Sequence, residues 1–425
     1  METIEQPEVP GRPRVVYVTA SLPYGDDERF VVPEIEELER QGVEVVICPR
    51  GWLTPHIESD TRHLLMKTLQ PRLISLAIVA MALRELAQSP RRAARAIWEL
   101  RRSRSPRMLL KNLAIVPKGL WLARYARHNR VQHLHAHWAG TTATLALVAS
   151  MVSGVPFSFT AHRWDIAEDN LLETKVRVAA FARAIDHLGA DELARLSRSP
   201  EDAVVVIHMG VVAVANGSPR RWGEPPTIAV PATFVEIKGH TYLLQAMSLL
   251  AERGVPVRVE LAGEGSERTA IEREIADRSL GDRVLVRGFV PHDQLLKELA
   301  EGRYDIVVLP SIIPGPGERE GIPVALMEAL AAGVPAIGTN TGGIPELLHS
   351  GAGLLVPDRD AKALADAIEL LIRNPEERAA MIERGYERVR SEFSIEPICR
   401  DLAARFAAAG QPDGVSTELA ERFRA

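Results

Sequence analysis

The sequence has few cysteines that could form disulfide bonds, and it has no apolar run long enough for a transmembrane helix. Its only cysteines are Cys48 and Cys399, too few for a disulfide framework or a four-thiolate metal site. The longest apolar run, residues 73–83, is well short of the roughly 20 residues that cross a bilayer. Glycine and proline are spread along the chain, which excludes a long low-complexity segment. What remains is a globular chain whose cores are built from ordinary packed side chains.

Acidic residues are almost missing from one stretch. Between Arg62 and Arg130 there are 16 Lys or Arg but only Glu85 and Glu99, although the whole chain has a net charge of −5. The N-terminal stretch, residues 1–14, is polar and acidic where a secretory signal would be basic and then apolar. We therefore expect a cytoplasmic protein without a transmembrane helix.

Strand-like and helix-like segments alternate through both halves of the chain. Such βαβ units build parallel sheets with helices on both faces, and a length of 425 residues favours two domains. Strand-like runs are predicted at 13–20, 43–48, 131–135, 156–160, 204–207, 227–230, 257–261, 284–287 and 306–309. The sequence therefore predicts an α/β protein.

The halves are joined by a stretch rich in Pro, Gly and Ser. The predicted parts are an N-terminal domain 1–212 with a basic helical segment 60–130, a linker 213–226, a C-terminal domain 227–395 and a helical segment 396–425. Doubly wound domains bind ligands outside the carboxyl ends of their strands, so the cleft between the two domains is the expected site.

Two carboxylates stand eight positions apart after the last strand-like run of the second half. Residues 318–330 read EREGIPVALMEAL and follow a Gly- and Pro-rich turn. Because proline is tolerated in the first turn of a helix, Pro323 is predicted to start one there. Glu320 would then lie in the loop before the helix and Glu328 within it, so that they contact different parts of one ligand.

This segment resembles the Glu-x7-Glu motif of retaining glycosyltransferases of family 4, which have the two-domain GT-B fold. In that family the first Glu engages hydroxyls of the donor sugar and the second the nucleotide ribose, which implies these roles for Glu320 and Glu328. Backbone amides near Gly321 and Ile322 are expected to hold phosphate or sugar oxygens. The resemblance implies two tandem Rossmann-like, doubly wound domains that face each other across a cleft, the first for the acceptor and the second for the donor.

Further segments of the second half resemble the same family. Lys238, in the run FVEIKGH, matches the Lys that neutralises the diphosphate, a compact cation for the charge that develops as the nucleotide leaves. A Gly-rich turn matches the one at which the nucleotide approaches the backbone, and a later Arg-Gly pair matches the segment beside the base. Lys238 and Glu320 are the predicted catalytic residues of this half. The predicted donor-binding residues are Gly263, Gly265, Arg287, Gly288, Arg319, Gly321, Ile322, Pro323 and Glu328.

The first half matches more loosely. The run FTAH ends a strand-like segment and resembles the family's T-x-H element, whose His contacts the transferred sugar, so His162 is a predicted catalytic residue. Asp165 beside it is a predicted cleft residue. Gly25 and Asp26 fall where the family has a glycine-rich loop over the diphosphate and acceptor.

One departure from the family bears on the diphosphate. The family pairs its Lys with an Arg five positions earlier, and here that position is Thr233, which cannot supply a second cation. Arg319, next to Glu320, is the residue that could compensate.

Three alternating histidines, His133, His135 and His137, invite a metal site. They lack a fourth ligand at a clear spacing, so we expect structural or cleft-rim residues and no metal. The resemblance likewise implies transfer with retention and without a bound metal or cofactor. The expected substrate is a nucleotide-sugar donor, a UDP-, GDP- or ADP-sugar.

The predicted function is that of a hexosyltransferase in exopolysaccharide, glycolipid or glycan assembly. The alternatives are a GT-B sugar phosphorylase or nucleotide-sugar-processing enzyme, and a non-catalytic GT-B partner protein, which Thr233 makes conceivable. The basic segment 60–130 is either a set of solvated helix faces or a peripheral contact with an anionic membrane at its inner face, where a lipid-linked acceptor would be met. Nucleic acid is the weaker alternative, because no recognition motif is present.

Overall fold

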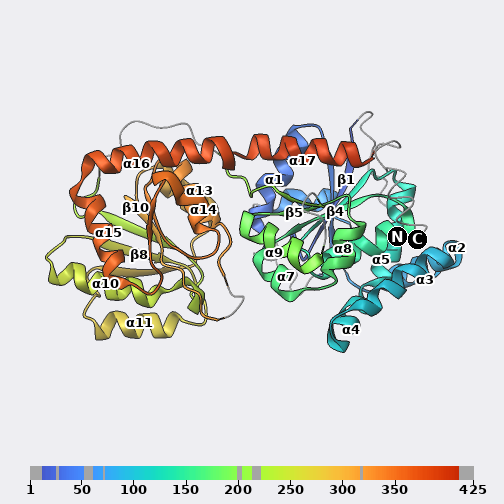
Figure 1. Cartoon of the computed structure of the whole chain (residues 1–425), viewed down its shortest axis with the longest axis horizontal. Coiled ribbons are helices and arrows are strands. Elements are labelled where there is room, and N and C mark those ends of the chain that lie inside the picture. Colours follow the sequence, from blue (N-terminus) through green and yellow to red (C-terminus); the bar gives the residue numbers. More distant parts are fainter. Residues whose placement is uncertain are drawn as a thin grey trace. The chain divides into compact units, whose positions relative to one another are not determined.

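The computed structural model describes residues 12–24, 28–51, 61–69, 72–198, 203–212, 222–315 and 319–410. Two compact units make up the chain (Figure 1). Unit 1 comprises Met1–His208 with Glu396–Ala425, and unit 2 comprises Met209–Ile395. The C-terminal helical segment, for which the sequence indicated no packing partner, thus belongs to unit 1.

Unit 1 is built on a six-stranded parallel sheet in the order β2-β1-β3-β4-β5-β6. Its strands are β1 (Arg14–Thr19), β2 (Glu44–Pro49), β3 (His133–His137), β4 (Phe157–Ala161), β5 (Phe181–Ala184) and β6 (Val204–Val206). Its helices are η1 (Arg29–Val31), α1 (Val32–Arg40), η2 (Arg62–Lys67), α2 (Leu76–Gln88), α3 (Pro90–Glu99), η3 (Leu100–Arg102), α4 (Pro106–Ala114), α5 (Val116–His128), α6 (Thr141–Ser153), α7 (Arg163–Glu168), α8 (Leu172–Val178), α9 (His187–Ser197) and α17 (Ile395–Gly410).

The two faces of this sheet differ in chemistry. On one face the alternate residues of β1 and β3 join a hydrophobic core with α5 and α6, through side chains such as Val16, Val18 and Leu134. On the other face β3 turns its histidines toward α17, whose Phe406 ring lies 4.9 Å from that of His133. Side chains alternate along a strand, so a single strand supplies both an apolar core and a buried polar row.

Unit 2 contains a second six-stranded parallel sheet, in the order β12-β11-β10-β7-β8-β9. Its strands are β7 (Thr227–Pro231), β8 (Arg258–Ala262), β9 (Val284–Gly288), β10 (Ile306–Leu309), β11 (Ala336–Thr339) and β12 (Leu354–Val356). Its helices are η5 (Glu236–Lys238), α10 (His240–Glu252), α11 (Arg268–Asp277), α12 (His292–Ala300), α13 (Val324–Ala331), α14 (Ile344–Leu348), η6 (His349–Gly351), α15 (Ala361–Arg373), α16 (Pro375–Arg388) and the π-helical η7 (Val389–Phe393).

The chain order in this sheet reverses between β7 and β10. Successive strands run outward from β7 through β8 to β9 and, on the other side, from β10 through β11 to β12. This is the order of dinucleotide-binding folds, in which a ligand lies at the carboxyl ends of the strands at the reversal. The loops that follow β7 and β10 are therefore the places where the fold presents a ligand site.

These two doubly wound parallel sheets confirm the predicted α/β class. The predicted strands are all present, with ends that differ by a few residues. The sequence pattern missed β5, β11 and β12, each of which has only three or four residues. In β5 the pattern is further hidden by Arg183, a charged residue that is fully buried. Among the described helices, none is long and apolar enough to cross a membrane.

Candidate active site

Lys238 and Glu320 meet in unit 2 at the reversal of the strand order. Lys238 ends η5 in the loop after β7, and Glu320 lies in the loop after β10. The Lys238 ammonium donates to Oε2 of Glu320 at 2.7 Å, and the Ser311 hydroxyl donates to the same oxygen at 3.2 Å. Both side chains keep some contact with solvent, 20% for Lys238 and 15% for Glu320. The two predicted catalytic residues of this half thus form one charged pair that a ligand can reach.

Glycines set the backbone beneath Lys238. Gly239 has a φ of +62°, and a Cβ there would stand 2.0 Å from the carbonyl oxygen of Pro310, so the loop after β7 presses directly on the loop after β10. Gly263 lets the loop after β8 approach in the same way, since a Cβ there would lie 1.9 Å from the carbonyl oxygen of Ala232. Gly265 likewise faces the carbonyl of Phe234. The predicted donor-loop glycines therefore have an internal role, which is to hold the segment that carries Lys238.

A third loop holds Glu320. A Cβ on Gly342, whose φ is +55°, would stand 1.8 Å from the carbonyl oxygen of Glu320. The N–H of Gly343 donates to that carbonyl at 3.1 Å, and Gly343 also packs against the backbone of Ile322. The Thr339 hydroxyl donates to the carbonyl of Ser311 at 2.5 Å, which ties the end of β11 to the loop after β10. Glu320 is thus placed by backbone contacts rather than by its own side chain alone.

Glu328 lies within α13, as predicted, but Pro323 does not start that helix. Pro323 is the N-cap residue with an extended ψ of 122°, and its carbonyl accepts from the N–H of Leu326 at 3.1 Å. Oε1 of Glu328 is 2.6 Å from Nε2 of His292, the first residue of α12. His292 is a site neighbour that the sequence reading missed. The sequence feature that could have identified His292 is its position directly after residues 287–291, the segment predicted to lie beside the nucleotide base.

Arg287 is engaged away from the Lys238–Glu320 pair. Its guanidinium donates to both oxygens of Glu298, at 2.5 and 2.9 Å, and lies 3.5 Å from Glu260. Hydrogen bonds from Arg287 lower the pKa of Glu298 to about 2. Gly288, with a φ of +73°, lets the end of β9 pass close to Glu264. Arg287 is therefore part of an ion-pair cluster with Glu298 and Glu260 at the edge of the sheet.

The position of the expected second cation is exposed. Thr233 is an exposed residue of the loop after β7. Arg319 is exposed as well, and no ion pair of its guanidinium is found within the described part of the chain. The residues just before it, 316–318, lie outside the described residues.

A pocket of about 210 Å³ opens beside this site, between the first turn of α10 and α11. Gly239, Thr241, Glu267 and Arg359 are among the residues that line it, but Lys238 and Glu320 are not. The pocket is therefore a neighbour of the predicted donor site rather than the donor site itself.

In unit 1, His162 is the residue that follows β4 and caps α7. It forms a capping box with Asp165, whose Oδ1 accepts from the His162 N–H at 2.6 Å. The other Asp165 oxygen accepts from the N–H of Ala139. Burial raises the pKa of Asp165 to about 7, against the opposing effect of these N–H groups. The buried Asp165 carboxylate thus supports the backbone at His162, and its predicted role in the cleft stays a prediction.

The imidazole of His162 is held among other aromatic rings. Its Nε2 lies 2.9 Å from Nε2 of His137, and its ring is tilted by 35° against that of Trp138, with the ring centroids 4.4 Å apart. Trp138 has a φ of +97°, a costly conformation for a bulky residue and one that clusters at functional sites. Burial holds the pKa of His162 well below its usual range and lowers that of His137 to about 3. Both imidazoles are therefore neutral, and His162 acts as a hydrogen-bonding group rather than a cation.

Glu28 organises the loop that precedes the predicted glycine-rich element. Its two carboxylate oxygens accept from the backbone N–H groups of Ala20, Ser21 and Leu22 at 2.6 to 2.8 Å, and Oε1 also accepts from Trp138 Nε1 at 2.7 Å. Gly25 and Asp26 themselves lie outside the described residues. Glu28 was missed because nothing in its sequence neighbourhood distinguishes it from a solvated acidic residue.

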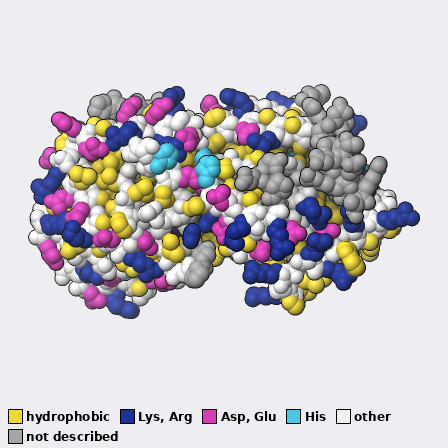
Figure 2. All heavy atoms as spheres, in the orientation of Figure 1, with side chains coloured by type: hydrophobic (Ala, Val, Ile, Leu, Met, Phe, Trp, Pro, Cys, Tyr) yellow, Lys and Arg dark blue, Asp and Glu magenta, His cyan; other side chains and the backbone are white. Residues whose placement is uncertain are grey.

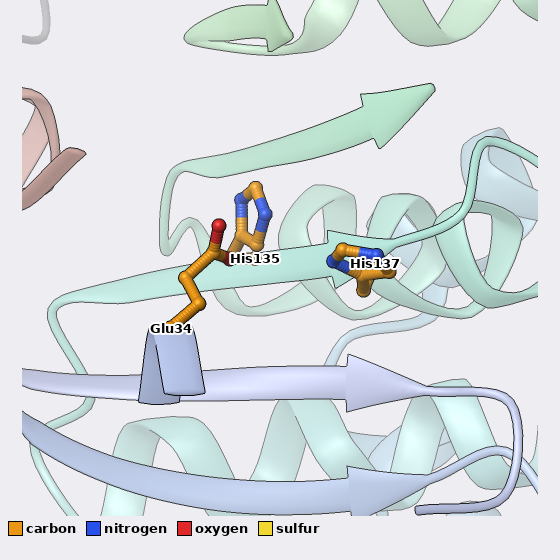
Figure 3. A group of neighbouring side chains, drawn as sticks. All are labelled: Glu34, His135 and His137. Carbon is orange, nitrogen blue, oxygen red and sulfur yellow. The ribbon is translucent and has the colours of Figure 1, made fainter. Parts of the chain in front are cut away.

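A group with potential metal ligands lies in unit 1, where Glu34 of α1 faces His135 and His137 of β3 (Figure 3). The Glu34 oxygens are bound by the Tyr17 hydroxyl at 2.9 Å and the Arg183 guanidinium at 2.6 Å. Both His135 nitrogens face hydroxyl groups of β4, at 2.8 and 3.0 Å. A cation here would compete with the buried Arg183 and with satisfied hydrogen bonds, so these residues do not fit a metal ion.

Residues 358–360 form an Asp-x-Asp triplet. In the large glycosyltransferase fold that is not GT-B, this pattern holds a metal. Here Asp360 is the N-cap of α15 and accepts from the N–H of Ala363 at 2.8 Å, while Asp358 lies near Arg359. Helix capping accounts for Asp360 without a metal.

Residues 217–388 match the family model of glycosyl transferases group 1. The matched segment holds the Lys238–Glu320 pair and Glu328. A "Putative colanic acid biosynthesis glycosyltransferase WcaL" of Escherichia coli (strain K12) is 35% identical over 225 residues, which are 52% of this chain and 54% of that protein. The chain spans about half the length of the curated relatives it matches first. The predicted resemblance to exopolysaccharide-type glycosyltransferases is confirmed.

Solved glycosyltransferases share the fold over most of the chain. A glycosyltransferase from Rickettsia africae ESF-5 superposes with a TM-score of 0.69 at 17% identity, over 95% of this chain and all of that one. Anabaena Alr3699/HepE in complex with UDP gives a TM-score of 0.67 at 15% identity, over 93% of this chain and all of that one. These similarities confirm the GT-B fold.

Proposed function

We propose that this protein is a retaining hexosyltransferase of the family 4 type, which moves a sugar from a nucleotide diphosphate to an acceptor in exopolysaccharide, glycolipid or glycan assembly. The observation that carries the proposal is the solvent-accessible Lys238–Glu320 pair at the strand reversal of unit 2. The match of residues 217–388 to glycosyl transferases group 1 supports it. So does the likeness to a fold that has been solved with UDP.

The pair has the chemistry that the donor needs. A diphosphate would draw the Lys238 ammonium away from Glu320 and free Oε2 to accept from sugar hydroxyls. Lys238 would then stabilise the negative charge on the departing nucleotide, which is the charge that grows in the transition state. The two groups satisfy each other at 2.7 Å, so each charge has a partner within the protein.

Other residues are proposed to bind the remaining parts of the donor, which are the ribose, the phosphates and the sugar. Glu328, 9% exposed at its side chain and bound by His292, is the proposed acceptor of the ribose hydroxyls. The amides at the start of α13, near Gly321 and Ile322, are proposed to hold phosphate or sugar oxygens. His162 of unit 1 is the proposed contact of the transferred sugar, as a neutral hydrogen-bonding group. The charge of the leaving group is assigned to Lys238, to Arg319 in place of the absent cation at Thr233, and to the helix start.

The donor is identified by incubating the full chain with UDP-, GDP- and ADP-sugars and measuring thermal shift and nucleotide release. We expect one nucleotide class to stabilise the protein, and nucleotide release to fall at least about a hundredfold in Glu320→Gln. The matched control is Glu301→Gln, which removes an exposed glutamate that pairs with Lys297 on α12. Unchanged release in Glu320→Gln would remove Glu320 from the site.

Retention is tested on the product. Proton NMR of the newly formed glycoside should show the anomeric configuration of the donor sugar. An inverted product would contradict the retaining mechanism while leaving transferase activity in place.

Exposed Thr233 favours one alternative, a non-catalytic GT-B partner protein, because the diphosphate then has one fewer cation. Binding of a nucleotide sugar with no release across lipid and glycan acceptors would support that alternative. Formation of a sugar 1-phosphate from a glycan and inorganic phosphate would instead indicate a sugar phosphorylase.

We also propose that the protein works peripherally at the inner face of a membrane. The proposal rests on the basic helices of residues 60–130 and on the advantage of meeting a lipid-linked acceptor there.

A further inference from the structure

Helix α2 turns a stripe of apolar side chains to solvent. Its buried side, which includes Ile78 and Ala82, packs toward α5. On the opposite side Leu76 is 92% exposed and Leu83 61%, with Val79 and Leu86 between and beyond them at 37% each. Residues 76, 79, 83 and 86 follow the spacing of one helix face. A contiguous apolar stripe on a surface marks a place where something binds.

The helices that follow α2 add positive charge next to this stripe. The exposed cations of α3, η3, α4 and the turn between them are Arg91, Arg92, Arg101, Arg102, Arg104, Arg107 and Lys111. Two large apolar side chains stand among them, Trp98 at 62% exposure and Leu110 at 70%. The Arg101 guanidinium lies 3.8 Å from the centre of the Trp98 ring. Tryptophan with basic neighbours is typical of the boundary between water and lipid.

The carboxylates of the same segment are turned inward. Glu85 is fully buried and accepts from Arg127 at 2.5 Å. Glu99 is 9% exposed and accepts from Arg177 at 3.0 Å. Within residues 72–114, therefore, no carboxylate is exposed. Among the described residues, the acidic groups from outside that reach this segment's exposed cations are at one edge, where Asp169 lies 3.8 Å from Arg104 and Glu168 3.5 Å from Lys111.

Figure 2 shows dark blue Lys and Arg side chains and yellow hydrophobic ones gathered over the part of unit 1 where Figure 1 places α3 and α4. We call the exposed stripe of α2 together with the exposed Trp98, Leu110 and cations of residues 91–111 the α2–α4 face.

We propose that the α2–α4 face docks on an anionic lipid bilayer, with the leucines of α2 and Trp98 in the headgroup region and the arginines against lipid phosphates. A positively charged surface attracts anions in general. A row of exposed leucines beside the cations, however, favours a lipid surface over a nucleic acid. The 13 residues of α2 are too few to cross a bilayer, so the helix would lie in the surface. The inference rests on the proposed function only for its purpose, which is to bring the enzyme to a lipid-linked acceptor.

The test is flotation of the full chain with phosphatidylcholine vesicles, with and without phosphatidylglycerol. We expect flotation only with the anionic lipid. Leu76→Gln with Leu83→Gln should lower the partition coefficient at least about tenfold. Arg91→Gln, Arg101→Gln and Arg107→Gln together should lower it about a hundredfold, since each cation contributes about fivefold.

Matched controls come from exposed residues outside this face. Leu285→Gln with Leu355→Gln removes two exposed leucines of unit 2, and Arg195→Gln, Arg273→Gln and Arg400→Gln remove three exposed arginines. These variants should float as the wild type does. Equal losses in test and control variants would overturn the α2–α4 face as the docking surface.

Two other results would overturn the proposal. One is flotation that does not depend on anionic lipid, or no flotation at all. The other is tight binding of a single-stranded oligonucleotide that displaces the protein from anionic vesicles and is unaffected by the Leu76 and Leu83 substitutions.

Brominated lipid should quench the fluorescence of the wild type more than that of Trp98→Phe if Trp98 enters the headgroup region.

The test is independent of the transferase proposal. Flotation is measured without nucleotide, and nucleotide-sugar hydrolysis is measured without vesicles. We expect the Leu76, Leu83 and arginine variants to hydrolyse the donor like the wild type. Loss of flotation with intact hydrolysis supports the docking face, whereas intact flotation without hydrolysis contradicts only the transferase.

Discussion

Glu34 is a buried carboxylate whose partners come from distant parts of unit 1. It accepts from Tyr17 of β1 and pairs with Arg183 of β5, which is itself fully buried. Removing one member of such a pair leaves an uncompensated buried charge. We expect Glu34→Ala to lower the free energy of unfolding by about 3–5 kcal/mol.

Denaturant titration measures this change, and Glu36→Ala on the same helix is the control. Glu36 is 45% exposed and pairs with a half-exposed His63, so its removal should cost less than about 1 kcal/mol. Equal effects of the two substitutions would show that the Arg183–Glu34 pair does not support the fold as described.

Because the histidines of β3 are buried, the free energy of unfolding is expected to depend on pH. Burial lowers the pKa of His133 to about 3, below the value of about 6.5 in an unfolded chain. Between these values the unfolded state binds more protons than the folded state, so stability is present above pH 6.5 and is lost as the pH falls toward 3.

We expect His133→Gln to reduce the proton uptake on unfolding near pH 5 by about one proton, measured from the slope of unfolding free energy against pH. His63→Gln, at an exposed position, is the control. An unchanged slope in His133→Gln would mean that this histidine is not buried in its neutral form.

At the same scale, the site residues show what a sequence can and cannot reveal. The Glu-x7-Glu spacing and the FVEIKGH run identified Lys238 and Glu320 through their resemblance to a family, although they are 82 residues apart. No pattern could show that Arg287 is bound by Glu298, or that His292 binds Glu328. Those contacts depend on how β9 and α12 pack, which no local spacing encodes.

At the scale of loops, the positive-φ glycines of unit 2 differ in what surrounds them, and some of them hold the loops of the proposed donor site together. Gly342 has a φ of +55° and faces the carbonyl of Glu320, whereas Gly254 has a φ of +69° with open space around it. Alanine strains the backbone at both positions, but only at residue 342 would its Cβ displace the loop that carries Glu320.

We therefore expect Gly342→Ala to weaken nucleotide-sugar binding at least about tenfold, while Gly254→Ala lowers stability by about 1 kcal/mol and leaves binding unchanged. Isothermal titration calorimetry of the two folded variants makes the comparison. Equal affinities would show that the loop at residues 341–343 does not position Glu320.

Helix α17 is the element that returns the chain to unit 1. Its Phe406 is fully buried, with ring contacts to Tyr17, His133 and Phe181. Phe406→Ala should lower the free energy of unfolding by about 3–5 kcal/mol, whereas Phe289→Ala, at a residue 56% exposed, should cost less than about 1 kcal/mol. Chemical denaturation of both variants checks this. Similar small losses would mean that α17 is not an integral part of unit 1.

The predicted C-terminal helical segment, residues 396–425, contains almost all of α17, whose observed bounds are Ile395–Gly410. Its partner could not be predicted, because its apolar face would fit the sheet of either half. The short strands β11 and β12 were missed for a related reason. Their short runs, AIGT and LLV, lack the consecutive Val and Ile residues that made the equally short β6 (VVV) and β10 (IVVL) recognisable, and such strands are fixed by the neighbours they pair with.

On the scale of the whole chain, the alternation of strands and helices was enough to predict two doubly wound α/β domains and, through the resemblance, the GT-B fold. The sheet orders add what periodicity cannot. In unit 2 the reversal between β7 and β10 places the loops of Lys238 and Glu320 together. The transferase proposal follows from that juxtaposition.

Binding of a nucleoside diphosphate to unit 2 through Lys238 is the most direct test of this proposal. The full chain is titrated calorimetrically with UDP, GDP and ADP, and the tightest of these is compared in Lys238→Ala and in Lys297→Ala, whose lysine is 72% exposed on α12. We predict at least about tenfold weaker binding in Lys238→Ala and wild-type binding in Lys297→Ala. Wild-type affinity in Lys238→Ala would contradict the assignment of the diphosphate to this site.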